Sequence, residues 1–239
     1  LAGASPTGIV TTGFSAALTV EDSEVFRNTT GIDLSRGEVR GSRIYANSGA
    51  GVLAPSLGIT LRGNSFYSNE VGFLSTAGNS GAGSFSIVNN LFYAQRLAAV
   101  RLTTSSPLAY ELVNNTIFEA SADGVVASAA RGVHLRNNIV WTQAGYGLHI
   151  ANDSQADFQS NFNLLYATGS GRVGFWQGDR TSLGDLRNAT FRDTDSLSAD
   201  PLFVGVDDLI LESSVLGIDG WIAGSGIAFP RENQYFWEL

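Results

Sequence analysis

The sequence predicts an all-β fold, a right-handed parallel β-helix of about seven coils, and two observations lead to this prediction. A segment of seven residues that mixes apolar and polar positions around a central Ser or Asn recurs roughly every 23 residues. A second short apolar segment, usually opened by glycine, follows each copy after about ten residues. Both segments are too short for helices, and no copy can bury its apolar side alone, so the copies must stack along an axis.

The first segment predicts a strand with a bend at its fourth position. Its copies are VEDSEVF at 20–26, VRGSRIY at 39–45, LRGNSFY at 61–67, IVNNLFY at 87–93, LVNNTIF at 112–118, LRNNIVW at 135–141 and FQSNFNL at 158–164. The bend residues, separated by 19, 22, 26, 25, 23 and 23 residues, are Ser23, Ser42, Asn64, Asn90, Asn115, Asn138 and Asn161. Stacking brings equivalent residues to about 4.8 Å from one another, so the asparagines are predicted to form a ladder of side-chain amides.

The last two positions of this segment predict two further ladders. The aromatic one consists of Phe26, Tyr45, Tyr67, Tyr93, Phe118 and Trp141, and the apolar one of Val25, Ile44, Phe66, Phe92, Ile117 and Val140. Two other repeat folds fit less well. A propeller blade needs about twice this period, and a leucine-rich repeat needs a leucine framework that the chain lacks.

The second segment predicts the strand that completes each unit. Its copies are GIDL at 31–34, GVLA at 51–54, GFLS at 72–75, AVRL at 99–102, GVVA at 124–127, GLHI at 147–150 and GFWQ at 174–177. An earlier GIVT at 8–11 has no unit before it, so we expect the chain to begin partway round a coil of a longer protein. We predict one domain over 1–239, with regular coils in 1–160. Residues 161–239 are expected to supply the last coil, an inserted loop with a short helix, and an irregular cap.

Composition excludes several kinds of chemistry. The chain has no cysteine, and all 14 residues counted as Lys or Arg are arginines, so disulfides, thiolate metal sites and lysine bases are impossible. The net charge of −8 argues against nucleic acid as a partner, because phosphate binding requires a basic surface. No apolar run approaches about 18 residues, so membrane insertion is not expected.

The C-terminal third carries a family resemblance. Asn161-Phe162-Asn163 stands where a D-Y-N pattern is expected, Asp200-Pro201-Leu202-Phe203-Val204 matches D-P-L-F-V, and Ser213, Ile218, Asp219 and Gly220 match part of L-x-x-x-S-P-x-I-D-x-G. With the repeats, these motifs resemble bacterial secreted right-handed β-helix repeat proteins of the pectate-lyase-like superfamily. The resemblance implies an extracellular or cell-surface location and a polysaccharide or surface glycan as partner. It leaves activity open, because the superfamily contains lyases, hydrolases, epimerases and non-catalytic modules.

Enzyme motifs of that superfamily are absent. The clustered aspartates with G-H-G and R-x-K of polygalacturonase-like enzymes, the W-x-D-H of common pectate lyases and the D-P-H-D of mannuronan epimerases do not occur. We therefore expect a non-catalytic module that binds glycan or serves as a spacer. The alternatives are a polysaccharide lyase, hydrolase or epimerase with an unfamiliar site, and a filament building block. No cofactor is expected; calcium is possible, although the chain has no calcium motif.

The sharpest candidate site lies on the outward side of the first segment. Glu111, His134 and Asp157 follow one another at intervals of 23 residues, so equal coils would place His134 between two carboxylates, with Arg136 beside it. Flanking carboxylates favour the protonated imidazole, so this group could act as a general acid and base or as a polar sugar-binding patch. The other interpretation is a solvated charge ladder between strands.

The outward side of the second segment offers a candidate ligand surface. Its predicted column is Asp33, Leu53, Leu74, Arg101, Val126, His149 and Trp176. We expect Trp176 beside His149, where the indole could stack on a sugar ring with Arg101 nearby. Alternatively, Trp176 packs beneath the loop at 178–200.

Overall fold

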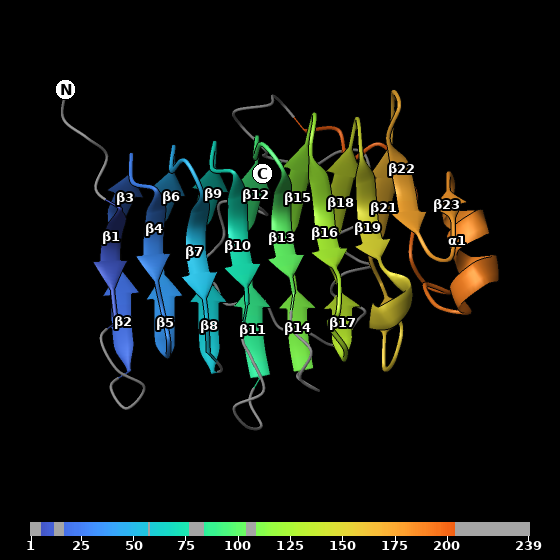
Figure 1. Ribbon diagram of the computed structural model, residues 1–239. Coiled ribbons are helices and arrows are strands. Elements are labelled where there is room, and N and C mark those ends of the chain that lie inside the picture. Colours follow the sequence, from blue (N-terminus) through green and yellow to red (C-terminus); the bar gives the residue numbers. More distant parts are fainter. Residues whose placement is uncertain (1–5, 12–16, 57, 77–83, 104–108, 204–239) are drawn as a thin grey trace.

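The computed structural model describes residues 6–11, 17–56, 58–76, 84–103 and 109–203. These residues form a β-helix of about seven coils, and each coil passes through three parallel strands before the next begins (Figure 1). The predicted fold class is confirmed. The seven-residue segment supplies two strands rather than one, because its bend residue separates the end of one strand from the start of the next.

The strands stack into three sheets that run the length of the molecule. Sheet A contains β1 (Thr7–Val10), β4 (Thr30–Asp33), β7 (Ala50–Ala54), β10 (Val71–Ser75), β13 (Ala98–Leu102), β16 (Asp123–Ala127), β19 (Tyr146–Ile150), β22 (Arg172–Phe175) and the antiparallel β23 (Asp179–Arg180). Sheet B contains β2 (Leu18–Glu21), β5 (Gly37–Arg40), β8 (Ile59–Arg62), β11 (Ser84–Val88), β14 (Ala109–Val113), β17 (Val133–Arg136) and β20 (Gln159–Asn161). Sheet C contains β3 (Glu24–Phe26), β6 (Arg43–Tyr45), β9 (Ser65–Tyr67), β12 (Leu91–Tyr93), β15 (Thr116–Glu119), β18 (Ile139–Thr142) and β21 (Leu164–Ala167).

The predicted amide ladder joins sheets B and C, and its last rung differs from the prediction. The Asn64 N–H donates to Asn90 Oδ1 at 3.0 Å, and each later asparagine repeats this bond to the next coil. The Asn138 N–H donates to Asn163 Oδ1 at 2.9 Å, so Asn161 is not the rung. The seventh coil is longer than expected because the turn before β20 contains the 3-10 helix η1 (Asn152–Ser154).

A second ladder, which the repeat pattern did not reveal, lies at the bend between sheets C and A. Here the Asn28 N–H donates to Asn47 Oδ1 at 3.0 Å, and the Asn47 N–H donates to Asn69 Oδ1 at 3.1 Å. The series continues from the Asn69 N–H to Gln95 Oε1 and from the Gln95 N–H to Glu119 Oε2. Both bends therefore satisfy turn amides inside the fold, where an unpaired N–H would be costly.

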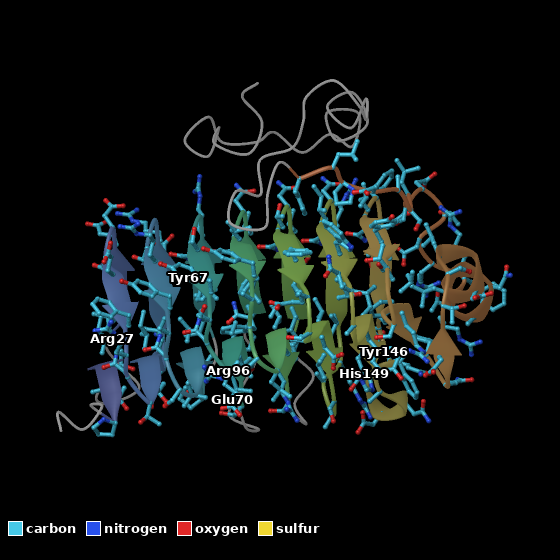
Figure 2. The ribbon with its side chains drawn as sticks, turned by 90° about the horizontal axis from the view of Figure 1, so that it is seen from above. Arg27, Tyr67, Glu70, Arg96, Tyr146 and His149 are labelled. Atoms are coloured by element: carbon cyan, nitrogen blue, oxygen red, sulfur yellow. The ribbon has the colours of Figure 1, made fainter. Side chains whose placement is uncertain are left out.

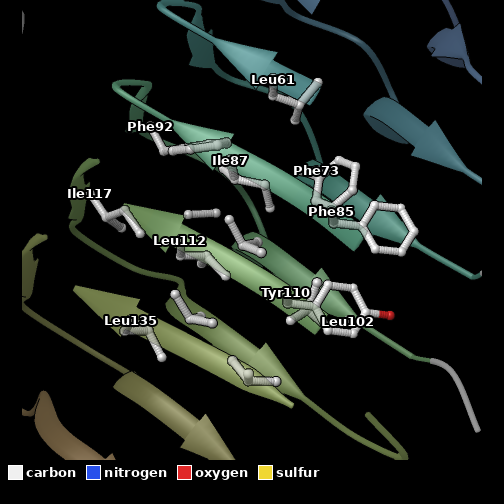
Figure 3. Packing of buried hydrophobic residues seen from close by; sticks show 14 of the residues in the cluster. Leu61, Phe73, Phe85, Ile87, Phe92, Leu102, Tyr110, Leu112, Ile117 and Leu135 are labelled. Atoms are coloured by element: carbon white, nitrogen blue, oxygen red, sulfur yellow. The ribbon is translucent and has the colours of Figure 1, made fainter. Parts of the chain in front are cut away.

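Inward residues of the three sheets form one continuous apolar core (Figure 3). The Phe66 and Phe92 rings stack with centroids 4.7 Å apart, and the Phe85 and Tyr110 rings stack at 4.9 Å. Burial raises the pKa of the Tyr110 phenol to about 12, and its hydroxyl pairs with Ser75 Oγ at 3.2 Å. The apolar and aromatic ladders predicted for sheet C are both confirmed by the strand register, with Tyr166 extending the aromatic one.

Helix α1 (Leu183–Thr190) closes the end of the core at the last coil (Figure 1). Ser182 begins the helix with a capping box: its hydroxyl accepts the Asp185 N–H, and the Asp185 carboxylate accepts the Ser182 N–H. Leu186 is buried and approaches Gly174 so closely that an added Cβ would lie 3.2 Å from the leucine. The chain then runs beside the last coil, where the Asp193 N–H donates to the Ser160 carbonyl.

The remainder of the predicted cap lies outside the described residues. This applies to Ser213, Ile218, Asp219 and Gly220. The domain boundaries predicted at 1–160 and 161–239 therefore stay a prediction. Within the described part of the chain, no helix has the length and apolar character required to cross a membrane.

Candidate functional site

A cavity of about 530 Å³ lies on the outer face of sheet B at its C-terminal end. Its floor comes from β14, β17 and β20, and its wall from the turn after β20 and the segment after α1. The lining residues are Glu111, His134, Leu135, Arg136, Gln159, Ser160, Asn161, Phe162, Phe191, Arg192, Asp193 and Thr194. Three of the four predicted catalytic candidates therefore line one cavity, which we call the sheet B pocket.

The imidazole and carboxylate at the floor of the sheet B pocket are in direct contact. Glu111 and His134 are register partners on β14 and β17, and His134 Nδ1 lies 2.7 Å from Glu111 Oε1. The His134 side chain is 28% exposed and the Glu111 side chain is 45% exposed, so solvent and a ligand can reach both. Occupation of Nδ1 by the carboxylate leaves Nε2 as the ring nitrogen that can contact a ligand.

The prediction that a second carboxylate flanks His134 is wrong. The partner of His134 on β20 is Gln159, two residues after the predicted Asp157. Asp157 is exposed in the turn before β20, with φ 57°, and it does not line the sheet B pocket. The long turn around η1 shifts the register of the last coil and thereby removes Asp157 from the column.

Arg136 and Arg192 bring positive charge to the sheet B pocket. The Arg136 guanidinium lies over the Phe162 ring, 5.0 Å from its centroid, in a cation–π arrangement. Arg192 Nε donates to the Phe158 carbonyl at 3.2 Å, which fixes its side chain along β20. Of the two lining carboxylates, Glu111 contacts His134, and Asp193 is fully buried and accepts hydrogen bonds from the hydroxyl groups of Ser160 and Ser196. The sheet B pocket therefore presents two guanidinium groups and one exposed carboxylate, that of Glu111, to a ligand, although the whole chain is acidic.

Two phenylalanines with left-handed backbones border the sheet B pocket. The residue before each rung of the first ladder has φ between 46° and 63°, and the residue types are Asp22, Gly41, Gly63, Asn89, Asn114, Asn137 and Phe162. Glycine, asparagine and aspartate tolerate this conformation, whereas a phenylalanine there is strained. Phe191 ends α1 with φ 55° and is 81% exposed. Strained or exposed aromatic residues at a cavity are an indication of function.

The second predicted ligand surface, on sheet A, differs from the prediction. His149 pairs in register with Phe175, so Trp176 does not lie beside it in the outward column. Trp176 instead packs against the core, with its ring 5.4 Å from that of Phe158. Arg101 lies two strands away, because Val126 separates it from His149. The structure thus does not bring Arg101, His149 and Trp176 together.

The polar residues around His149 form hydrogen bonds and an ion pair with one another. Tyr146 and His149 lie close together near the C-terminal end of sheet A, as Figure 2 shows, and their ring centroids are 4.9 Å apart. The Tyr146 hydroxyl donates to Asp179 at 2.7 Å, and Arg172 Nε lies 2.7 Å from the other oxygen of this carboxylate. The hydrogen bond from Tyr146 and the charge of Arg172 lower the pKa of Asp179. We interpret this cluster as structural, because it links β19 to the β22–β23 hairpin.

A second cavity, of about 320 Å³, lies at the other end of sheet B. It is lined by Glu21, Asp22, Glu38, Arg40, Gly41, Arg62 and Gly63. Arg40 pairs with Glu21, so acidic groups dominate this cavity. In the described ranges, no three His, Cys, Asp or Glu side chains are grouped so that they could hold a metal ion.

The strands, ladders and cavities define a β-helix repeat protein. Residues 7–163 match the family described as the right-handed β-helix region, which is more than half of the chain, so the chain belongs to this family. The match ends at Asn163, the last asparagine of the first ladder. Searches of curated proteins and of solved structures gave no match. Membership of the family establishes the fold and not an activity.

Proposed function

We propose that the protein is a non-catalytic glycan-binding module and that the sheet B pocket binds an acidic saccharide. The observation that carries the proposal is that two arginines and two phenylalanines with strained backbones line the same pocket. Arg136 and Arg192 supply donors for a carboxylate or sulfate, since guanidinium groups pair bidentately with planar anions. The exposed Phe191 ring offers an apolar face to a sugar ring.

Dimensions and polarity of the pocket support this proposal. A volume of about 530 Å³ lies within the range of about 300–1,000 Å³ that is usual for small-ligand sites. The Gln159 amide lines the floor and can pair with sugar hydroxyls, while Asn161 is held by Asp195 through both atoms of its amide. The regular coils provide a rigid platform, so little ordering of the floor is required on binding.

Glycan recognition favours a location where polysaccharides are found. We therefore propose that the module works outside the cell or at the cell surface. The family resemblance of the C-terminal motifs supports this location, and detection of the native protein in surface and secreted fractions would test it.

A binding screen with matched variants tests the proposed function. The wild-type protein is titrated calorimetrically with hexuronate, sulfated and neutral oligosaccharides, alongside Arg136→Gln, Phe191→Gly and Arg40→Gln. We expect the first two variants to lose at least tenfold in affinity. Arg40→Gln, in the acidic cavity at the far end of sheet B, should bind like the wild type. Absence of binding to every oligosaccharide, or equal affinity of all variants, would overturn the proposal.

The contact between His134 and Glu111 favours a second candidate, a polysaccharide-cleaving or epimerising enzyme. An imidazole oriented by a carboxylate can serve as a general base through its other nitrogen. The same oligosaccharides are therefore incubated with the protein, with and without calcium, and reducing ends and unsaturated products are measured. If the wild-type protein shows turnover and His134→Ala does not, the protein is this enzyme and not a non-catalytic binding module.

A further inference from the structure

Glu119 ends the second ladder, the one at the bend between sheets C and A. Asn47 Nδ2 donates to the Val25 carbonyl of the preceding coil, and Asn69 Nδ2 donates in the same way to the Ile44 carbonyl at 2.9 Å. Gln95 Nε2 continues the series with a 2.8 Å bond to the Phe66 carbonyl. Each rung thus accepts a backbone N–H through its oxygen and donates a side-chain N–H to a carbonyl.

A glutamate at this rung can accept the backbone N–H, but an ionised carboxylate has no N–H to donate to a carbonyl. Glu119 is fully buried, and its Oε2 accepts the Gln95 N–H at 2.8 Å, as an amide oxygen would. Its Oε1 is buried too, and it makes no hydrogen bond with any residue in the described part of the chain. By strand register, the next carbonyl in the series belongs to Phe92, and a carbonyl can only accept. An ionised carboxylate would therefore hold an unpaired negative oxygen inside the fold.

No described cation compensates this charge. Arg96, on the turn before β13, donates to the carbonyls of Asn47, Ser48 and Ser68 near the protein surface (Figure 2). Asp123, at the start of β16, accepts the Tyr146 N–H. On the other packed strands, Tyr93 of β12 and Arg101 of β13 belong to outward columns, and β18 has no charged residue. Burial raises the pKa of Glu119 well above its ordinary value of 4.5.

We infer that Glu119 is a neutral carboxylic acid at neutral pH, with the protonated Oε1 taking the place of the amide donor and bonding to the Phe92 carbonyl. One proton thereby completes the second ladder. Loss of that proton places a charge among buried carbonyls and breaks the rung. The fold therefore contains a pH-sensitive element that strengthens the coils in acid and weakens them in alkali, independently of any ligand in the sheet B pocket.

The sign of the pH dependence follows from linkage. In the unfolded chain the group ionises near 4.5, whereas in the folded chain it keeps its proton to higher pH. The stabilisation is therefore complete below pH 4.5 and is lost as the pH rises toward the folded pKa. Across this window the unfolding equilibrium constant rises about tenfold per pH unit relative to a chain without the acid.

The test compares Glu119→Gln with the wild type by urea unfolding between pH 4 and pH 9. Glutamine can both accept and donate at this rung, so the ratio of the wild-type to the variant unfolding constant should rise about tenfold per unit above pH 4.5. Glu70→Gln, on an exposed turn beside Asn69, serves as the control and should keep a constant ratio. An infrared difference spectrum between the wild type and Glu119→Gln at pH 7 should show the C=O band of a neutral carboxylic acid. A constant ratio for Glu119→Gln, or a carboxylate band at pH 7, would overturn the inference.

Discussion

Replacement of Asn115 by leucine tests how much the first amide ladder contributes to stability. Asn115 Oδ1 accepts the Asn90 N–H at 3.0 Å, and its Nδ2 donates to the Ile87 carbonyl at 2.7 Å. Leucine has a similar volume and no polar atoms, so it removes these two bonds together with the side-chain bonds that Asn115 makes to Asn90 and Asn138. The Asn90 N–H and the Ile87 carbonyl then lose these partners. Asn138 Oδ1 still accepts the Asn115 N–H at 2.9 Å and is not orphaned.

The expected cost can be worked from these groups. A buried group deprived of its partner costs about 1–3 kcal/mol, and two backbone groups, the Asn90 N–H and the Ile87 carbonyl, lose a partner here, so the free energy of unfolding should fall by about 4 kcal/mol. Asn115→Ser should cost less, because Ser42 occupies the equivalent rung and its Oγ accepts the Ser23 N–H at 3.1 Å.

Urea unfolding followed by tryptophan fluorescence measures both variants. Asn152→Leu, at an exposed position of η1, is the control and should change the free energy of unfolding by less than about 0.5 kcal/mol. If Asn115→Leu unfolds at the wild-type urea concentration, the ladder does not hold the coils together and the reasoning is refuted.

Three further predictions follow from the cap, the core and the pocket. Leu186→Ala should lower the free energy of unfolding by about 3 kcal/mol, because Leu186 is buried over Gly174; a wild-type melting temperature would contradict a capping role for α1. Tyr110→Phe should cost about 1 kcal/mol by leaving Ser75 Oγ without its partner, and urea unfolding would detect it; no loss would show that this hydrogen bond is not stabilising. Phe191→Gly should raise the free energy of unfolding by about 0.5–1 kcal/mol, because glycine adopts φ 55° without strain, while calorimetry records weaker saccharide binding. A loss of both stability and binding would show instead that the ring packs as structure.

Repetition explains why most of the fold could be predicted from the sequence. The bend asparagines recur with one residue type, so the ladder from Asn64 to Asn138 follows directly from their spacing. The prediction failed at the last rung because Asn161 and Asn163 are two residues apart and the turn containing η1 sets the choice between them. The second ladder was missed because it changes residue type along its length, from Asn69 to Gln95 to Glu119.

In the sheet B pocket, the residues that lie in the repeat could be predicted, and most of those outside it could not. Glu111 and His134 each stand directly before a copy of the seven-residue segment, at 112–118 and at 135–141, so this common place in the repeat was sufficient to predict their contact. Phe191 and Arg192 come from the segment after α1, which has no repeat register, and no sequence pattern placed them at sheet B. Phe162 could have been recognised, since it is the one residue that is neither glycine, asparagine nor aspartate at the left-handed position before the rungs.

The two histidines of the chain allow the most direct test of glycan recognition. His134 lies in the sheet B pocket and His149 lies on sheet A, so each reports on one of the two predicted ligand surfaces. Their ring signals are followed by NMR while a hexuronate oligosaccharide is added. We predict that the His134 signals shift with saturation and that the His149 signals stay in place. A shift of His149 alone, or of neither histidine, would contradict recognition of an acidic saccharide by the sheet B pocket.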